Sequence, residues 1–261
     1  MRKIMILLML ALLVCARAEE QVIWKLDETN TAVDGKKSWY SDKPLVVEPL
    51  PEGGFALKSQ ATRRLLLQPD AWLVFELAKA EIVEPGKYTM WSMHVHTDKY
   101  GYIVGSDHQV PLGLHTIKLN SLTKPMTTGV IFYNYNLNLY FKYMKLVTEP
   151  ENSLCAIVPE GKTVLEVGDK ITILLKLKDP CEDVSCKLMQ NRFPFSLNGT
   201  DAVDLKAVDD DCKIWRADIT IKSYQSKRPV GMRGIRIKAS VLGGKLNTPI
   251  YGVIPAAFKK Q

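Results

Sequence analysis

Apolar and polar residues alternate in short runs along most of this chain, and turn residues separate the runs. Alternation with a period of two is typical of a β-strand that buries one face. In the N-terminal half, the pattern predicts strands over residues 71–77, 88–96, 101–104, 113–119, 129–135 and 139–147. In the C-terminal half, it predicts strands over residues 171–177, 212–221 and 234–241, and a last strand that ends near Phe258. No window shows sustained helical periodicity, so we expect an all-β protein.

The chain divides into two parts near residue 150. The segment Thr148–Asn152 is polar and contains a proline, and it follows a strongly apolar run. All four histidines precede this segment, whereas every cysteine except Cys15 follows it. About 240 residues are enough for two ordinary domains. We therefore predict two β-sandwich domains, one over residues 19–149 and one over residues 150–261.

The first 18 residues have the three parts of a secretory signal peptide. Two basic residues come first, residues 4–14 form an apolar core, and Ala16-Arg17-Ala18 is a small-x-small cleavage site. The core is too short to span a bilayer, which takes about 20 apolar residues. We expect cleavage after Ala18, no membrane span, and a secreted or periplasmic protein. Acylation of Cys15, as in a bacterial lipoprotein, is the alternative, but that motif requires a small residue in place of Val14.

Removal of the signal peptide lowers the net charge. The chain carries +7, and the peptide contains three basic residues and no acid, which leaves 7 − 3 = +4. The remaining lysines and arginines are interleaved with aspartates and glutamates, as on a solvated surface, and form no stripe that would follow a phosphate backbone. We do not expect a nucleic-acid partner.

Four cysteines remain after the signal peptide: Cys155, Cys181, Cys186 and Cys212. An even number in an exported chain indicates two structural disulfides. Three pairings are possible, and the sequence does not choose among them. Zinc is the alternative ligand, but four residues separate Cys181 from Cys186 and no histidine follows His115.

His94 and His96 are two residues apart on a predicted strand, so they share one face of it, about 6.5 Å apart along the chain. Two imidazoles so placed can bind one transition-metal ion. The stretch resembles the motifs of cupins, which are metal-binding jelly rolls: His94-Val95-His96 matches the first motif, and residues 105–120 resemble the second. The glutamate of the first motif is missing, and the second is one residue short before His115, which turns that side chain to the opposite face. A cupin-type metal-dependent enzyme that uses His94 and His96 is an alternative function.

A second resemblance covers residues 65–148. The segments EPGKYTMWSMHVH and VPLGLHTIKL are similar to a recurring pair of segments in galactose-binding-like jelly rolls, which serve as carbohydrate-binding modules. This resemblance implies a jelly-roll N-terminal domain and a carbohydrate ligand. The C-terminal half resembles immunoglobulin-like sandwiches, with about seven strands in roughly 110 residues, which implies a spacer or docking module.

A sugar-binding surface needs aromatic rings, against which the C–H faces of sugars stack, and polar groups for the hydroxyls. Tyr133 and Tyr135 share one face of a predicted strand and alternate with Asn134 and Asn136, which could bind hydroxyls. The aromatic candidates for ligand binding are Trp39, Tyr40, Tyr100, Tyr102, Tyr133 and Tyr135.

Calcium is a further candidate ligand. Asp209–Asp211, with Asp201 and Asp204 upstream, supply oxygen atoms of the kind that Ca²⁺ binds, although aspartates are also ordinary turn residues. No nucleophile elbow, phosphate loop or dinucleotide fingerprint is present in the sequence. His94 and Tyr102 could supply the base and acid of a lyase.

The sequence therefore predicts an exported, non-catalytic protein of two β-sandwich domains that requires no cofactor. We expect the N-terminal domain to bind carbohydrate or a cell-surface glycan, and the C-terminal domain to act as a spacer or to dock a protein partner. A cupin-type enzyme and a structural envelope or adhesion component remain as alternatives.

Overall fold

A computed structural model describes residues 20–26, 46–67, 71–96, 101–107, 111–119, 128–190, 193–226 and 235–259. Only the backbone is described for residues 60–67, 90–96, 101–107, 128–133, 193 and 226. The predicted signal peptide and the candidates Trp39, Tyr40 and Tyr100 lie outside the described residues.

The described chain is built from β-strands and contains no α-helix, which confirms the predicted all-β fold. Strand β13 shows the reason: its side chains alternate between buried and more exposed positions, and Ile171, Ile173 and Leu175 lie in the core. A helix would place these apolar residues around its circumference instead. The strands are β1 (Val22–Lys25), β2 (Val47–Pro49), β3 (Phe55–Leu57), β4 (Gln60–Leu67), β5 (Trp72–Ile82), β6 (Met90–His96), β7 (Gly101–Asp107), β8 (Gly113–Lys118), β9 (Thr128–Tyr135), β10 (Leu137–Val147), β11 (Ser153–Ile157), β12 (Val164–Leu165), β13 (Lys170–Lys176), β14 (Asp183–Gln190), β15 (Phe193–Leu197), β16 (Ala202–Val203), β17 (Lys206–Ala207), β18 (Ile214–Thr220), β19 (Tyr224–Ser226), β20 (Ile235–Leu242), β21 (Ile250–Val253) and β22 (Ala257–Phe258).

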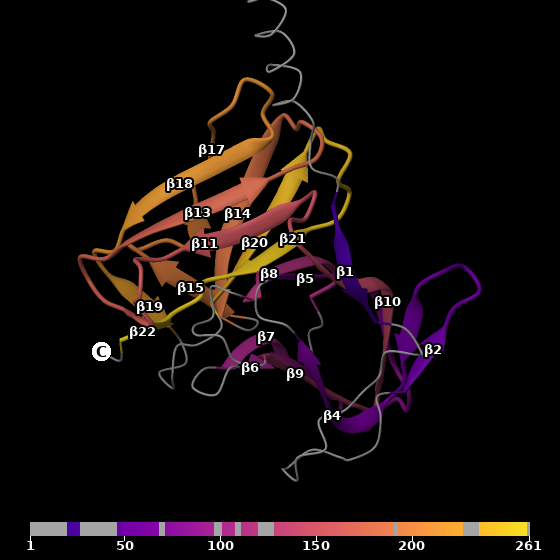
Figure 1. Ribbon diagram of the computed structural model, residues 1–261. Coiled ribbons are helices and arrows are strands. Elements are labelled where there is room, and N and C mark those ends of the chain that lie inside the picture. The colour runs from indigo at the N-terminus through magenta and orange to yellow at the C-terminus, as the bar shows by residue number, and fades with distance from the viewer. Residues whose placement is uncertain are drawn as a thin grey trace, which may run out of the picture.

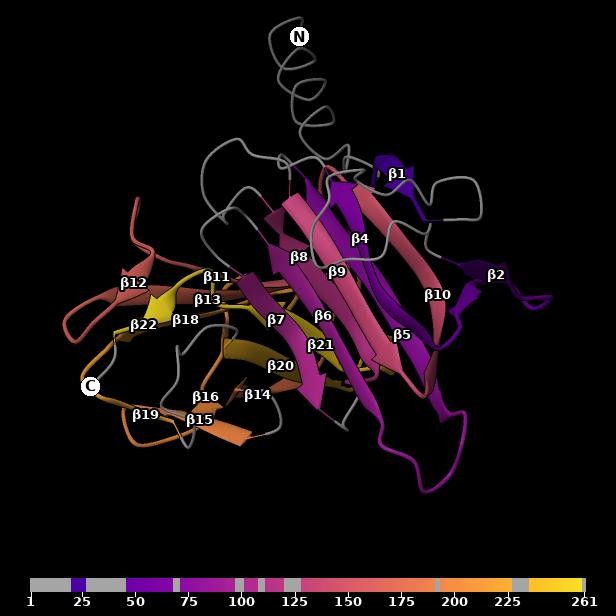
Figure 2. The ribbon, with the colours of Figure 1, turned by 90° about the horizontal axis from the view of Figure 1, so that it is seen from below.

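Two sheets lie opposite each other in the N-terminal half (Figures 1 and 2). The first has the strand order β8-β5-β10-β3-β2, and β1 pairs with β10. The second has the order β4-β9-β6-β7 and lies in front of the first in Figure 2. Every pairing within these two sheets is antiparallel.

The C-terminal half also has two facing layers (Figure 1). One contains the strands β19-β15-β14-β20-β21, with β16 paired to β14, and the other has the order β11-β13-β18-β17. A short parallel pair, β12 and β22, lies beside them. The apolar residues of the two layers meet in one core, because strands such as β14 bury every second side chain.

The largest sheet runs through both halves of the chain, because β21 pairs with β8 in parallel. We call the contact of β8 with β21 and β11 the seam. At the seam, the Thr116 hydroxyl is 3.1 Å from the carbonyl oxygen of Leu154. The same hydroxyl accepts a hydrogen bond from the Leu154 N–H at 2.9 Å. Gly252 lets β21 approach β11 closely, because a Cβ atom at this position would lie 2.0 Å from the Leu154 oxygen. The five residues Gly113–Ile117 are all buried, as expected for a strand that is covered on both faces.

Two clusters of buried apolar side chains form the core. One draws its members mainly from the residues before 147, and the other mainly from the residues after it. Val74 and Leu114 of the N-terminal half belong to the second cluster, and Val253 of the C-terminal half belongs to the first. The domain boundary near residue 150 stays a prediction.

No helix among the described residues is long and apolar enough to cross a membrane.

Candidate functional site

The pairing of β6 with β9 places several of the predicted site residues on one face of a sheet. Ser92 pairs with Tyr133, and Met90 pairs with Tyr135. Directly paired residues of antiparallel strands lie on the same face, and residues two apart on one strand do so as well. His94 and His96 therefore share a face with both tyrosines.

Tyr135 shows that this face is the outer one at the end of β9. Its side chain is 50 % exposed, whereas the preceding Asn134 is fully buried. Alternate residues of a strand point to opposite sides, so the face that carries Tyr135 looks away from the core at this point. We call Tyr88, His94, His96, Tyr133 and Tyr135 together the Tyr–His face.

Tyr88 joins the set because its ring meets that of Tyr135. The ring centroids are 6.4 Å apart, the planes are tilted by 39°, and Tyr88 is 61 % exposed. Ile82 and Val83 are also exposed at this end of the β5–β6 connection. Tyr88 is not among the aromatic residues that the sequence predicts to bind a ligand. The signal was present, because Tyr88 is an even number of residues from His94 and His96.

Asn136 fixes the turn that precedes Tyr88. Its side-chain oxygen accepts the N–H of Glu84 at 2.8 Å, and its amide group donates to the carbonyl oxygens of Glu84 at 3.0 Å and Lys87 at 3.4 Å. Its φ of 53° lies in the left-handed region, which asparagine tolerates better than most residues. The predicted Pro-Gly turn is present as well, with Gly86 at a φ of 81°. The position of Tyr88 next to Tyr135 thus depends on Asn136.

The expectation that Asn134 and Asn136 bind sugar hydroxyls is wrong. Asn136 is 7 % exposed and its amide is occupied by the turn. Asn134 is fully buried, and its amide nitrogen lies within hydrogen-bonding distance of the carbonyl oxygens of Leu57, Lys58 and Leu137. Asn134 stabilises the junction of β9, β10 and β3, and Asn136 stabilises the turn between β5 and β6.

Tyr102 lies on the other face of the same sheet. It pairs with Val95, which alternates with His94 and His96 along β6. The backbone therefore does not bring Tyr102 and His94 to one face as an acid and a base of a lyase.

His115 belongs to a different sheet from His94 and His96, and it is part of the core. Its ring stacks between Phe75, at a centroid distance of 4.5 Å, and Tyr251, at 4.6 Å. Its Nε2 atom is 2.7 Å from the carbonyl oxygen of Pro111. Burial lowers the pKa of His115 to about 3, and the positive charge of Arg236 acts in the same direction. His115 is a neutral structural residue at the seam and does not complete a metal site.

The predicted disulfides are absent from the described structure, in which all four cysteines are free thiols. Cys186 is buried in the core of the C-terminal half. Cys155 follows Leu154, which belongs to that same core, so Cys155 points to the other side of β11. Cys181 and Cys212 lie next to each other.

Three of the aspartates proposed for calcium, Asp204, Asp209 and Asp211, serve a turn or ion pairs. Asp209 caps a turn, because its side-chain oxygen accepts the N–H groups of Lys213 at 2.9 Å and Ile214 at 2.8 Å. Asp204 pairs with Lys206 at 2.8 Å. In the part of the chain that the structure describes, no three His, Cys, Asp or Glu side chains come together as a metal site would require.

A hollow of about 490 Å³ opens between the two layers of the C-terminal half. Apolar residues line part of it, among them Leu188, Leu197 and Ile219, and the Arg216–Asp218 ion pair lies among the lining residues at 2.9 Å. Hydrogen bonds from Arg216 and then Thr172 lower the pKa of Asp218. Asp218 therefore stays ionised and paired, which does not suit a general acid or base at neutral pH.

No protein-family model matches the chain, and no curated protein matches it either. Among solved structures, the chain is similar to a β-1,2-glucanase from Parabacteroides distasonis, with 10 % identity and a TM-score of 0.23. The alignment covers 83 % of this chain and 35 % of the glucanase, so this chain spans about a third of the length of that structure.

Proposed function

We propose that this protein is an exported, non-catalytic protein that binds carbohydrate through the Tyr–His face. The observation that carries the proposal is the contact between two exposed tyrosine rings, Tyr88 and Tyr135, at a centroid distance of 6.4 Å. Large exposed aromatic side chains are costly to leave in water, and a sugar ring covers them with its C–H face.

Two features support this assignment over a purely structural role for the pair. Asn136 holds the turn before Tyr88 in place, so little conformational entropy is lost when a ligand covers the rings. The register of β6 and β9 also continues the face with Tyr133, His94 and His96. Imidazole and phenol groups donate and accept hydrogen bonds, which sugar hydroxyls require.

We further propose that the C-terminal half supports the binding half. The continuous sheet and the buried seam between β8 and β21 favour a fixed spacing between the Tyr–His face and whatever the C-terminal half contacts. Export would fit a ligand on the outside of a cell, and it rests on the signal peptide predicted over residues 1–18.

A glycan array tests the proposal. The mature chain, residues 19–261, is compared with the double variant Tyr88→Ala/Tyr135→Ala and with the control Tyr140→Ala. Tyr140 is a partly exposed tyrosine on β10, in the other sheet of the N-terminal half. We expect the mature chain and the control to bind the same glycans and the double variant to lose them. An array on which the mature chain binds nothing removes the carbohydrate assignment.

The shared face of His94 and His96 also keeps a transition metal as the second candidate ligand. Metal analysis of protein purified without a histidine tag separates the two ligands. Stoichiometric metal in the mature chain that disappears in His94→Ala/His96→Ala would favour the metal site. Glycan binding without metal favours the tyrosine pair.

A further inference from the structure

Cys181 and Cys212 are 31 residues apart in sequence and adjacent in the fold. The N–H of Cys181 donates to the carbonyl oxygen of Cys212 at 3.4 Å, and the Cys181 Sγ atom is 3.9 Å from the same oxygen. The first cysteine follows β13, and the second lies in the turn that precedes β18. Their backbones are thus as close as those of neighbouring strands.

The turn around Cys212 is fixed without a covalent bond. Cys212 has a φ of 52°, in the left-handed region, and its N–H donates to the carbonyl oxygen of Asp209 at 3.2 Å. The indole N–H of Trp215 donates to the Cys212 carbonyl oxygen at 3.0 Å. Together with the Asp209 cap on Lys213 and Ile214, these bonds hold Cys212 in one place.

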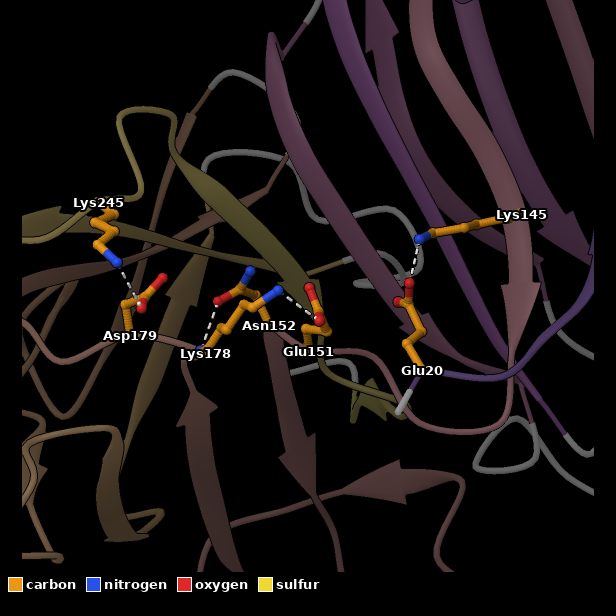
Figure 3. A network of polar contacts seen from close by, with 7 residues as sticks. All are labelled: Glu20, Lys145, Glu151, Asn152, Lys178, Asp179 and Lys245. Carbon is orange, nitrogen blue, oxygen red and sulfur yellow. Dashed lines mark hydrogen bonds and ion pairs between the residues drawn. The ribbon is translucent and has the colours of Figure 1, made fainter. Parts of the chain in front are cut away.

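Polar contacts also hold the residues just before Cys181, Lys178 and Asp179 (Figure 3). The backbone N–H of Lys178 donates to the Asn152 side chain at 2.9 Å, and the Lys245 ammonium group pairs with Asp179 at 3.2 Å. Gly244 packs directly on Cys181, because a Cβ atom at position 244 would lie 3.1 Å from the Cys181 Cβ atom. Both partners of the pair are therefore positioned before any bond forms.

Cys155 and Cys186 do not form a second pair of this kind. The Cys186 side chain lies inside the C-terminal core, whereas Cys155 lies on the side of β11 that faces away from this core. Burial raises the pKa of Cys155, and it raises the pKa of Cys186 to about 12. Thiols of this kind are poor nucleophiles near neutral pH.

We propose that Cys181 and Cys212 form a disulfide when the folded chain meets a small-molecule disulfide, whereas Cys155 and Cys186 stay reduced. Cys212 is the more exposed of the two, since Cys181 is only 5 % exposed. The thiolate of Cys212 attacks one sulfur of the small disulfide and releases one small thiolate. The thiolate of Cys181 then attacks the Cys212 sulfur and releases the second. Two protons and two electrons leave the cysteines, and the small disulfide is reduced to two thiols.

The bond would close a loop that contains β14, β15, β16 and β17. A cross-link restricts the unfolded chain, so oxidation of the full mature chain should raise its melting temperature by about 5–10 °C. Burial raises the pKa of Cys181. The second step should therefore accelerate as the pH rises from 7 to 9, because more thiolate becomes available.

The experiment treats the mature chain with oxidised glutathione and follows the intact mass and the linked peptides. The matched variants are Cys212→Ser, which removes one partner, and Cys155→Ser, which leaves the pair intact. We expect the mature chain and Cys155→Ser to lose two hydrogen atoms, yield one linked peptide that joins residues 181 and 212, and gain the same thermal shift.

Three results would overturn the proposal. One is a linked peptide that contains Cys155 or Cys186, and the second is a stable glutathione adduct at Cys212 in the mature chain. The third is an equal thermal shift in Cys212→Ser. Peptide mapping of the unmutated chain needs no variant, so a variant that fails to fold does not affect the decision.

Discussion

Replacement of His115 by phenylalanine should abolish one component of the pH dependence of stability. The imidazole lies between Phe75 and Tyr251, with interplanar angles of 6° and 14°. Phenylalanine is flat and of similar size, so it can keep both ring contacts. It loses the hydrogen bond to the Pro111 carbonyl oxygen, which is 2.7 Å from Nε2. That loss should cost about 1 kcal/mol at pH 7.5.

The size of the pH effect follows from the two pKa values of His115. Its pKa is about 3 in the folded protein and about 6.5 in the unfolded chain. Between these values the unfolded chain binds one proton more than the folded protein does. The contribution of neutral His115 to the free energy of unfolding is therefore fully present above pH 6.5, and it is lost as the pH drops towards 3. The loss amounts to roughly 2.6 kcal/mol between pH 7.5 and pH 4.5.

Urea unfolding of the mature chain and of His115→Phe between pH 7.5 and pH 4.5 measures this component. Carboxylates are common to both proteins, so their contributions cancel in the difference. We expect the unmutated chain to be about 1 kcal/mol more stable at pH 7.5 and roughly 1.6 kcal/mol less stable at pH 4.5. A difference in the free energy of unfolding between the two proteins that stays constant with pH would contradict the conclusion that His115 is buried and neutral. It would also contradict the packing of β8 against β21 that buries this histidine.

Two further substitutions test the local architecture by thermal or urea unfolding. Asn136→Ala should lower the free energy of unfolding by about 2–3 kcal/mol, because alanine loses the hydrogen bonds to the turn and is strained at a φ of 53°. Asn136→Gly loses the same hydrogen bonds but not the backbone strain, so it should cost less. Equal stability of all three proteins would contradict the role of Asn136. Gly252→Ala should lower the free energy of unfolding by about 3 kcal/mol or more, because its Cβ atom would meet the Leu154 oxygen at 2.0 Å. The control Gly53→Ala has open space around it and should cost about 1–2 kcal/mol for its φ of 91°. Similar losses in the two variants would argue against the close approach of β21 and β11.

The strands were predictable because each depends on neighbouring residues. The alternation in residues 171–177 and 129–135 reappears as β13 and β9, and the Pro-Gly pair before Tyr88 reappears as a turn. Such patterns report which face of a strand is buried, and that is a local property.

The pairing of β8 with β21 was not predictable from these patterns. Residues 114 and 250 pair across more than half of the chain, and alternation carries no information about the partner of a strand. The burial of His115 depends on that pairing, because Tyr251 of β21 stacks on its ring.

The candidate site was predictable in part. The sequence placed Tyr133 and Tyr135, and separately His94 and His96, on strand faces, and the structure brings these two faces together. The sequence-based prediction for Asn134 and Asn136 was wrong, because an asparagine that caps a turn and one that faces a ligand look alike in sequence. The role of Asn134 was decided by its contacts with β3 and β10, and that of Asn136 by the turn between β5 and β6.

The affinity of the tyrosine pair for a glycan tests the central claim most directly. Titration calorimetry with a glycan bound on the array compares the mature chain, Tyr135→Ala and Tyr140→Ala. We predict that Tyr135→Ala binds about tenfold more weakly, a loss of about 1.4 kcal/mol, and that Tyr140→Ala binds as the mature chain does. Equal affinities for all three proteins would contradict the account, because the glycan would then bind elsewhere.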